Sequence, residues 1–269
     1  PSFERSLMEY LDSELGQVES FLVSSWDINA TRRHDQLISG NDISFSHLLV
    51  PTILEILKKS AGHENFNVLD VGCGTGVLSQ ILGHQVARVV GVDPSSESIR
   101  IASDYCHRQT NVDFVCVPIE HYSPENSGDF NFVVAHMVLH TIPPSRLPSA
   151  LTQIHRLMTP SGIFVASLPH PAFYPMHKPE TFGLGNGRYS YNIPRFYRHT
   201  FTISRDRDPL PSKTPYFHRP MEHYTKSFAE AGFLVRDMHE PFPSEEIRSL
   251  YPKEKRFDDT YFLIFECVK

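Results

Sequence analysis

The chain has 269 residues, enough for one large α/β domain or two small ones. Hydrophobic residues make up 40% and charged residues 21%, and the formal net charge is −6 with neutral histidines, so we expect no nucleic-acid partner. Neither an apolar run of eighteen residues nor a basic-then-apolar secretory start occurs, which predicts no membrane span and favours a cytoplasmic protein.

The N-terminal segment, residues 1–50, is predicted to be a helical lid. Phe3, Leu7, Leu11 and Leu15 follow a helical spacing, and Trp26 is the only tryptophan of the chain. Residues 46–59 predict a second amphipathic helix, and its early proline lies in the first turn, where proline is tolerated. We expect the main domain to cover residues 51–269.

Five short apolar runs follow in the next part of the chain. They are rich in Val, Ile and Phe and cover 67–71, 88–92, 112–117, 130–135 and 162–168. Helical or turn segments separate them, which predicts parallel strands buried on both faces. Right-handed crossovers between such strands give a doubly wound, Rossmann-like α/β fold.

Residues 170–220 interrupt this alternation with many prolines and glycines. Residues 198–204 and 213–219 predict two strands there, so we interpret 170–220 as an insertion after strand five that caps the substrate. The core is predicted to resume with a helix over 221–231 and strands over 233–237 and 260–268. Four cysteines lack CxxC spacing, which predicts free thiols.

A glycine-rich segment, Leu69-Asp70-Val71-Gly72-Cys73-Gly74-Thr75-Gly76, follows the first predicted strand. Its glycines allow a sharp bend and a close approach to a ligand. The dinucleotide fingerprint needs a sixth-position glycine, where this chain has Val77, and no Gly-Lys-Ser/Thr of a P-loop follows. A nicotinamide-dependent oxidoreductase is therefore disfavoured.

A second motif, Gly91-Val92-Asp93-Pro94-Ser95, ends the second predicted strand. An acidic residue at this place accepts hydrogen bonds from the ribose hydroxyls of an adenosine ligand. Asp93 follows Gly76 by the length of one helix and one strand, and the pair is more specific than the glycines alone.

Together the two motifs resemble motif I and the following acidic loop of class I S-adenosylmethionine-dependent methyltransferases of the small-molecule type. Residues 114–122, 130–142 and 157–165 and the segment Phe217-His-Arg-Pro extend the resemblance over roughly 50–269. It implies a seven-stranded sheet with an antiparallel last strand and S-adenosyl-L-methionine as cofactor. The cofactor-binding residues that it implies are Asp70, Gly72, Cys73, Gly74, Gly76, Asp93, Pro94, Ile119, Glu120 and Ala135. One departure is Pro118, which stands where many relatives carry an adenine-binding Asp.

Methylation of a hydroxyl requires removal of a proton, and a histidine or carboxylate usually takes it. His136 follows the fourth strand, where such enzymes place residues that face the substrate, and His140 follows four residues later, so both are candidate catalytic residues. No third ligand follows in a metal-binding pattern, and we expect no metal.

The substrate is expected to be a small molecule, for example a secondary metabolite methylated on oxygen or nitrogen, and a homodimer is left open. Aromatic and histidine side chains of the lid and the insertion are candidate pocket residues. They are Trp26, His170, Tyr174, Tyr191, Phe196 and His218. The alternatives are a C-methyltransferase, a cyclase on the same fold, or a non-catalytic protein that binds S-adenosylmethionine.

Overall fold

The computed structural model describes residues 21–124, 128–184, 189–201, 209–252 and 260–269. The proposed periodicity of Phe3, Leu7, Leu11 and Leu15 lies outside these residues. Residues 21–38 form a helix, followed by a π-helical turn η1 (Phe45–Leu49) that runs directly into α2 (Val50–Lys58). The predicted helix over 46–59 is therefore confirmed, with a wider first turn.

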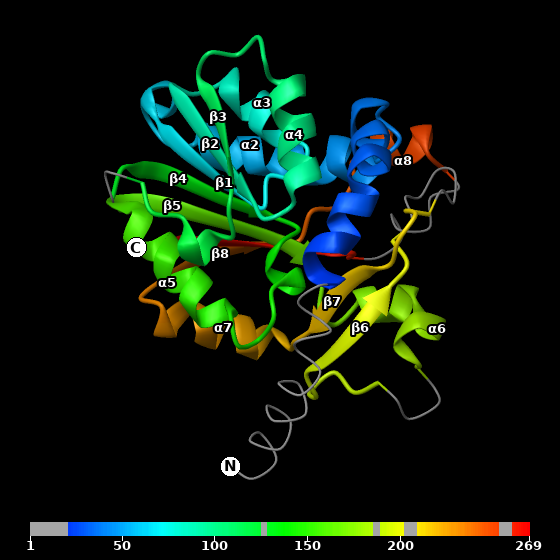
Figure 1. Cartoon of the computed structure of the whole chain (residues 1–269). Coiled ribbons are helices and arrows are strands. Elements are labelled where there is room, and N and C mark those ends of the chain that lie inside the picture. The colour runs from blue at the N-terminus through cyan, green and yellow to red at the C-terminus, as the bar shows by residue number, and fades with distance from the viewer. Residues whose placement is uncertain (1–20, 125–127, 185–188, 202–208, 253–259) are drawn as a thin grey trace.

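A seven-stranded sheet forms the centre of the molecule, in the order β3-β2-β1-β4-β5-β9-β8 (Figure 1). Its strands are β1 (Asn67–Val71), β2 (Arg88–Asp93), β3 (Val112–Cys116), β4 (Phe130–His136), β5 (Met158–Pro169), β8 (Leu234–His239) and β9 (Phe262–Val268). The first five pair in parallel, and β9 lies antiparallel between β5 and β8. The predicted sheet and its antiparallel last strand are confirmed.

Helices cover both faces of this sheet (Figure 1). The longer helices of the core are α3 (Val77–Gly83), α4 (Ser96–Tyr105), α5 (Leu147–Leu157) and α7 (Met221–Glu230), and α8 (Glu245–Leu250) precedes β9. Alternate strand residues separate into two apolar clusters, one with α2 and α3 and the other with α5 and α7. Val68 belongs to the first cluster and Leu69 to the second, as the two-residue period of a doubly covered strand requires.

Short single-turn elements connect the core. They are η2 (His63–Asn65), η3 (Ile119–His121), η4 (Leu139–Thr141), η5 (Tyr174–His177) and the helix α6 (Pro179–Phe182). Among them, η3 and η4 follow β3 and β4, so they lie at the carboxyl end of the sheet, where doubly wound folds bind ligands.

The segment predicted as an insertion carries a separate two-stranded antiparallel sheet, β6 (Arg195–His199) and β7 (Thr214–His218). The expected strand over 213–219 is confirmed, whereas the expected strand over 198–204 begins earlier, at Arg195, and 202–204 lie outside the described residues. Pairing of Phe196 with Phe217 sets this register, and their rings lie 4.8 Å apart. The position of β6 therefore follows its cross-strand aromatic contact with β7 and not the residue pattern of β6 by itself.

Candidate functional site

The loop between β1 and α3 has the backbone that its glycines predict. Gly72, Gly74 and Gly76 have φ of +66°, +53° and +78°, a region that other residues rarely adopt. A Cβ at Gly72 would lie 2.4 Å from Val138, whereas a Cβ at Gly74 would meet nothing within 4 Å. The loop is thus packed against the β4 exit on one side and has open space beside Gly74.

Asp93, the last residue of β2, faces this loop. Its Oδ2 accepts a hydrogen bond from the Gly74 N–H at 2.9 Å, and its Oδ1 accepts one from the Ser95 N–H at 2.8 Å. The pKa of Asp93 is raised to about 6, mainly by burial and to a smaller extent by the nearby Asp27 carboxylate, against the effect of the two backbone hydrogen bonds. Additional donors, such as two ribose hydroxyls, would stabilise this carboxylate.

Asp70 lies in β1 and is almost fully buried. The Ser79 hydroxyl donates to its Oδ2 at 2.6 Å, and burial raises the pKa of Asp70 to about 7. The open space beside Gly74 and two desolvated carboxylates fit a ligand with an adenosine ribose and a positive charge.

The remaining predicted cofactor residues lie at the same end of the sheet. Pro94 is exposed beside Asp93, Ile119 is buried in η3, and Ala135 is fully buried in β4. The Glu120 carboxylate pairs with the Arg146 guanidinium at the start of α5, so it is held next to the predicted adenine loop.

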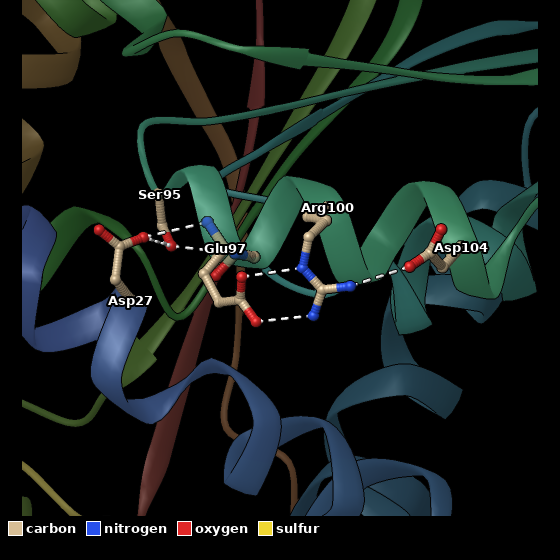
Figure 2. A network of polar contacts seen from close by, with 6 residues as sticks. Asp27, Ser95, Glu97, Arg100 and Asp104 are labelled. Carbon is tan, nitrogen blue, oxygen red and sulfur yellow. Dashed lines mark hydrogen bonds and ion pairs between the residues drawn. The ribbon is translucent and has the colours of Figure 1, made fainter.

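The helix over 21–38 is tied to the start of α4 by Asp27, a residue that the sequence analysis missed. Figure 2 shows its Oδ1 accepting hydrogen bonds from the Ser95 hydroxyl at 2.6 Å and from the Glu97 N–H at 3.1 Å. On the same α4 surface, Arg100 pairs with Glu97 and Asp104 (Figure 2). Ser95 thereby links two acidic residues, because its N–H binds Asp93 and its hydroxyl binds Asp27.

The same helix also binds the inserted segment. The Asn29 amide donates to the Ser212 carbonyl at 3.0 Å, and its Oδ1 accepts from the Ser212 N–H at 2.8 Å. The helix over 21–38 therefore bridges the start of α4 in the core and the loop before β7. No short-range pattern could reveal this, because the partners are 68 and 183 residues apart.

A pocket of about 760 Å³, its open mouth included, lies between this helix, the end of β4 and the inserted sheet. It is lined by Trp26, Arg33, Asp42, Ser44, Phe45, Leu49, His136, Met137, His140, Pro169, Tyr174, His199, Phe201, Thr214, Pro215, Tyr216, Tyr261 and Phe262. Four sequence candidates, Trp26, His136, His140 and Tyr174, are thus brought together.

The chain turns sharply at the pocket wall just after His136. Met137 has φ of +58°, and its N–H is held by the Ser167 carbonyl at 2.9 Å and the Ser167 hydroxyl at 3.1 Å. The Ser167 hydroxyl also lies 2.8 Å from His136 Nδ1. Ser167 on β5 therefore holds both the strained backbone of Met137 and the ring of the first candidate histidine.

Both candidate histidines are neutral at physiological pH. Burial lowers the pKa of His136 to about 4, with a smaller contribution from Arg33 that Asp42 opposes. Burial lowers the pKa of His140 to about 3, and His199, Arg219 and His136 lower it further. A neutral imidazole in a pocket has a lone pair that can accept a proton.

The other substrate candidates lie outside the lining of this pocket, and their contact with substrate stays a prediction. His170 lies 3.1 Å from Glu240, and Phe196 packs against Phe217. Tyr191 accepts from the Met221 N–H through its hydroxyl and from His218 Nε2 through its carbonyl. The sequence analysis missed Arg33, Asp42 and Tyr216, and the abundance of histidines in the insertion was the only signal for His199.

Comparisons with known proteins agree with this geometry. The methyltransferase domain family matches residues 68–162. An uncharacterised methyltransferase of Schizosaccharomyces pombe is 27% identical over 203 residues, which cover 73% of this chain and 70% of that protein. The ubiquinone biosynthesis O-methyltransferase of Xylella fastidiosa is 28% identical over 170 residues, 62% of this chain and 63% of that protein.

Solved structures share the fold. An S-adenosylmethionine-dependent methyltransferase of Mesorhizobium loti has a TM-score of 0.58 at 15% identity, covering 80% of this chain and 96% of that chain. The 1,6-didemethyltoxoflavin-N1-methyltransferase of Burkholderia thailandensis, with bound 1,6-didemethyltoxoflavin and S-adenosylhomocysteine, has a TM-score of 0.57 at 18% identity and covers 90% of this chain and 87% of that chain. Residues 68–162 of the chain are thus a methyltransferase domain, and the fold is that of S-adenosylmethionine-dependent methyltransferases.

Two of the solved structures that share this fold, the Burkholderia enzyme among them, are complexes with S-adenosylhomocysteine. Within the described ranges, no helix of the methyltransferase is long and apolar enough to cross a membrane. Its candidate substrate pocket adjoins the cofactor loop, because Gly72 packs on Val138, the neighbour of the pocket residue Met137.

Proposed function

We propose that this methyltransferase methylates a hydroxyl group of a small aromatic molecule, and that His136 accepts the hydroxyl proton. The carrying observation is a pocket beside the cofactor loop that combines aromatic walls with buried, neutral histidines. The O-methyltransferase name of the Xylella relative supports oxygen as the target atom. His140 is the second candidate for the proton acceptor.

The proposed roles of the cofactor residues follow from their positions. Asp93 would accept hydrogen bonds from the ribose hydroxyls, and Asp70 and the loop Gly72–Gly76 would face the methionine part. Ile119 would offer its backbone N–H to the adenine, with Glu120 beside it. When bound, the cofactor supplies an activated methyl group on a positively charged sulfur.

The rest of the chemistry belongs to the protein. The pocket must hold the hydroxyl oxygen in line with the methyl group and exclude water. We propose that the lid, residues 1–50, and the insertion, residues 170–220, close this pocket together. The hydrogen bonds of Asp27 to the core and of Asn29 to the insertion support that role, because one helix holds both sides.

A panel of small hydroxyl and amine compounds with labelled S-adenosylmethionine tests the proposal. O-methyl products that disappear in His136→Gln, with cofactor affinity unchanged in calorimetry, are the expected result. Methylation of nitrogen or carbon alone would contradict it, as would full turnover in His136→Gln. His107→Gln, an exposed histidine just after α4, is the control.

A further inference from the structure

Arg219 belongs to the Phe217-His-Arg-Pro segment, for which the proposed function gives no role. Its side chain is buried, with 3% of its surface exposed. The guanidinium donates to the Leu139 carbonyl at 3.1 Å and to the Ile142 carbonyl, and it lies over the Phe217 and Tyr224 rings at 5.6 and 5.8 Å. Within the described part of the chain, no carboxylate pairs with this arginine.

A buried cation without an anion is costly, so its persistence calls for an explanation. The two carbonyls that it binds belong to the turn that contains His140, because Leu139 is the first residue of η4 and Ile142 directly follows it. Arg219 therefore holds the turn that carries a pocket histidine, and it places a positive charge behind that turn.

His140 has an unusual environment. Its Nδ1 atom is buried and has no hydrogen-bond partner among the described residues, and the ring packs on Tyr216 at a centroid distance of 5.4 Å. The ring also lines the pocket, so His140 lies next to the space that a bound ligand would occupy.

The pocket as a whole carries little negative charge to balance Arg219. Among the residues that line it, Asp42 is the only carboxylic acid, and it pairs with Arg33 at 2.7 Å. The titratable groups that surround His140 and Arg219 are His136 on β4, His199 on β6, Tyr216 and His218 on β7, and His223 and Tyr224 on α7. None of these side chains is a carboxylic acid, so none of them supplies a negative charge to balance Arg219.

We propose that Arg219 and His140 make this pocket an oxyanion site, so that the substrate hydroxyl is bound in its ionised form and the substrate class is an acidic hydroxyl, a phenol or an enol. This inference rests on the proposed hydroxyl-directed function. On ionisation the O–H bond breaks, its electron pair stays on oxygen, and the proton passes to neutral His136. The charge of Arg219 and the polar edge of His140 stabilise the oxyanion, and Arg219 acts through η4 as a positioning residue.

The test uses 4-nitrophenol, whose yellow anion reports ionisation directly and without turnover. With wild-type protein, we expect the ionisation constant of the bound nitrophenol to rise about tenfold or more, since a nearby opposite charge lowers a pKa by at least about one unit. Arg219→Lys keeps the charge and should keep most of the effect, whereas Arg219→Met should abolish it. Arg88→Met, an exposed arginine paired with Asp113, is the control for a general charge change.

Unchanged ionisation of nitrophenol in wild-type protein, or no binding of it up to its solubility, overturns the inference. The inference is also overturned if Arg219→Met still binds S-adenosylhomocysteine and shifts the ionisation constant of nitrophenol as much as the wild-type protein does. If Arg219→Met does not fold, the wild-type protein alone tests the inference. The affinity for nitrophenol must then increase as the pH is raised and the phenol ionises. The affinity for 4-nitroanisole, which cannot ionise, must stay constant over the same pH range. The proposed function fails separately, when no hydroxyl compound of the panel is methylated.

Discussion

Asp93→Asn should separate cofactor affinity from stability, because this carboxylate is held in an unfavourable environment. Its pKa is raised to about 6 from 3.8, mainly by burial. A shift of about two units corresponds to roughly 3 kcal/mol of destabilisation of the charged form, an upper value because Asp93 keeps part of its surface exposed. This shift already includes the backbone hydrogen bonds from Gly74 and Ser95, and the partial exposure of Asp93 reduces the value to about 1–2 kcal/mol.

The expected net result at pH 8 is a cofactor-free variant that is more stable by about 1–2 kcal/mol, a few degrees in melting temperature. The sign follows from the raised pKa. The wild-type protein has the full contribution of protonated Asp93 below pH about 4 and loses it as pH rises through about 6. The difference between variant and wild type should therefore be absent below pH about 4 and complete above pH about 7.

Cofactor affinity should change in the opposite direction. The variant loses one charge-assisted hydrogen bond to the ribose, worth about 1.5–3 kcal/mol. This corresponds to a dissociation constant that is roughly 10- to 150-fold larger. Calorimetric titration with S-adenosylhomocysteine and scanning calorimetry across pH measure both effects. Asp113→Asn, exposed on β3, is the control and should change neither.

Unchanged affinity in Asp93→Asn would refute the ribose assignment. A variant that is less stable at every pH would refute the reasoning on burial, because it would show that the backbone hydrogen bonds to Gly74 and Ser95 outweigh the cost of the charge.

Three other changes test the site. Gly72→Ala should weaken cofactor binding at least tenfold, since its Cβ would lie 2.4 Å from Val138 at a positive φ, and calorimetry with normal affinity would contradict this. Asp27→Ala should raise the Michaelis constants for cofactor and for substrate by about tenfold each, because the Ser95 hydroxyl and the Glu97 N–H lose their shared acceptor. Steady-state kinetics in which only one of the two constants changes would contradict this prediction. Deletion of residues 1–45 should abolish turnover while cofactor affinity falls only moderately, and full turnover in the truncated protein would show that the pocket closes without the lid.

The conformation of the glycine loop and the position of Asp93 beside it could be predicted from the sequence because their signals are local. The glycines must adopt positive φ within one short loop, and Asp93 ends the next strand, so chain spacing alone brings them together through the β1–β2 pairing. The strands could also be predicted, because a strand that is covered by helices on both faces has apolar residues at consecutive positions.

The substrate pocket was decided by tertiary structure alone. Asp42, His136, His199 and Phe262 belong to four distant segments, and only β4 pairing, the inserted sheet and the helix over 21–38 place them around one space. A lone Asp27 or Arg219 has no sequence signal, because its meaning depends on partners 68 and 80 residues away. Residue spacing encodes secondary structure, whereas the balance of charges in a buried site depends on which distant side chains the folded chain brings together.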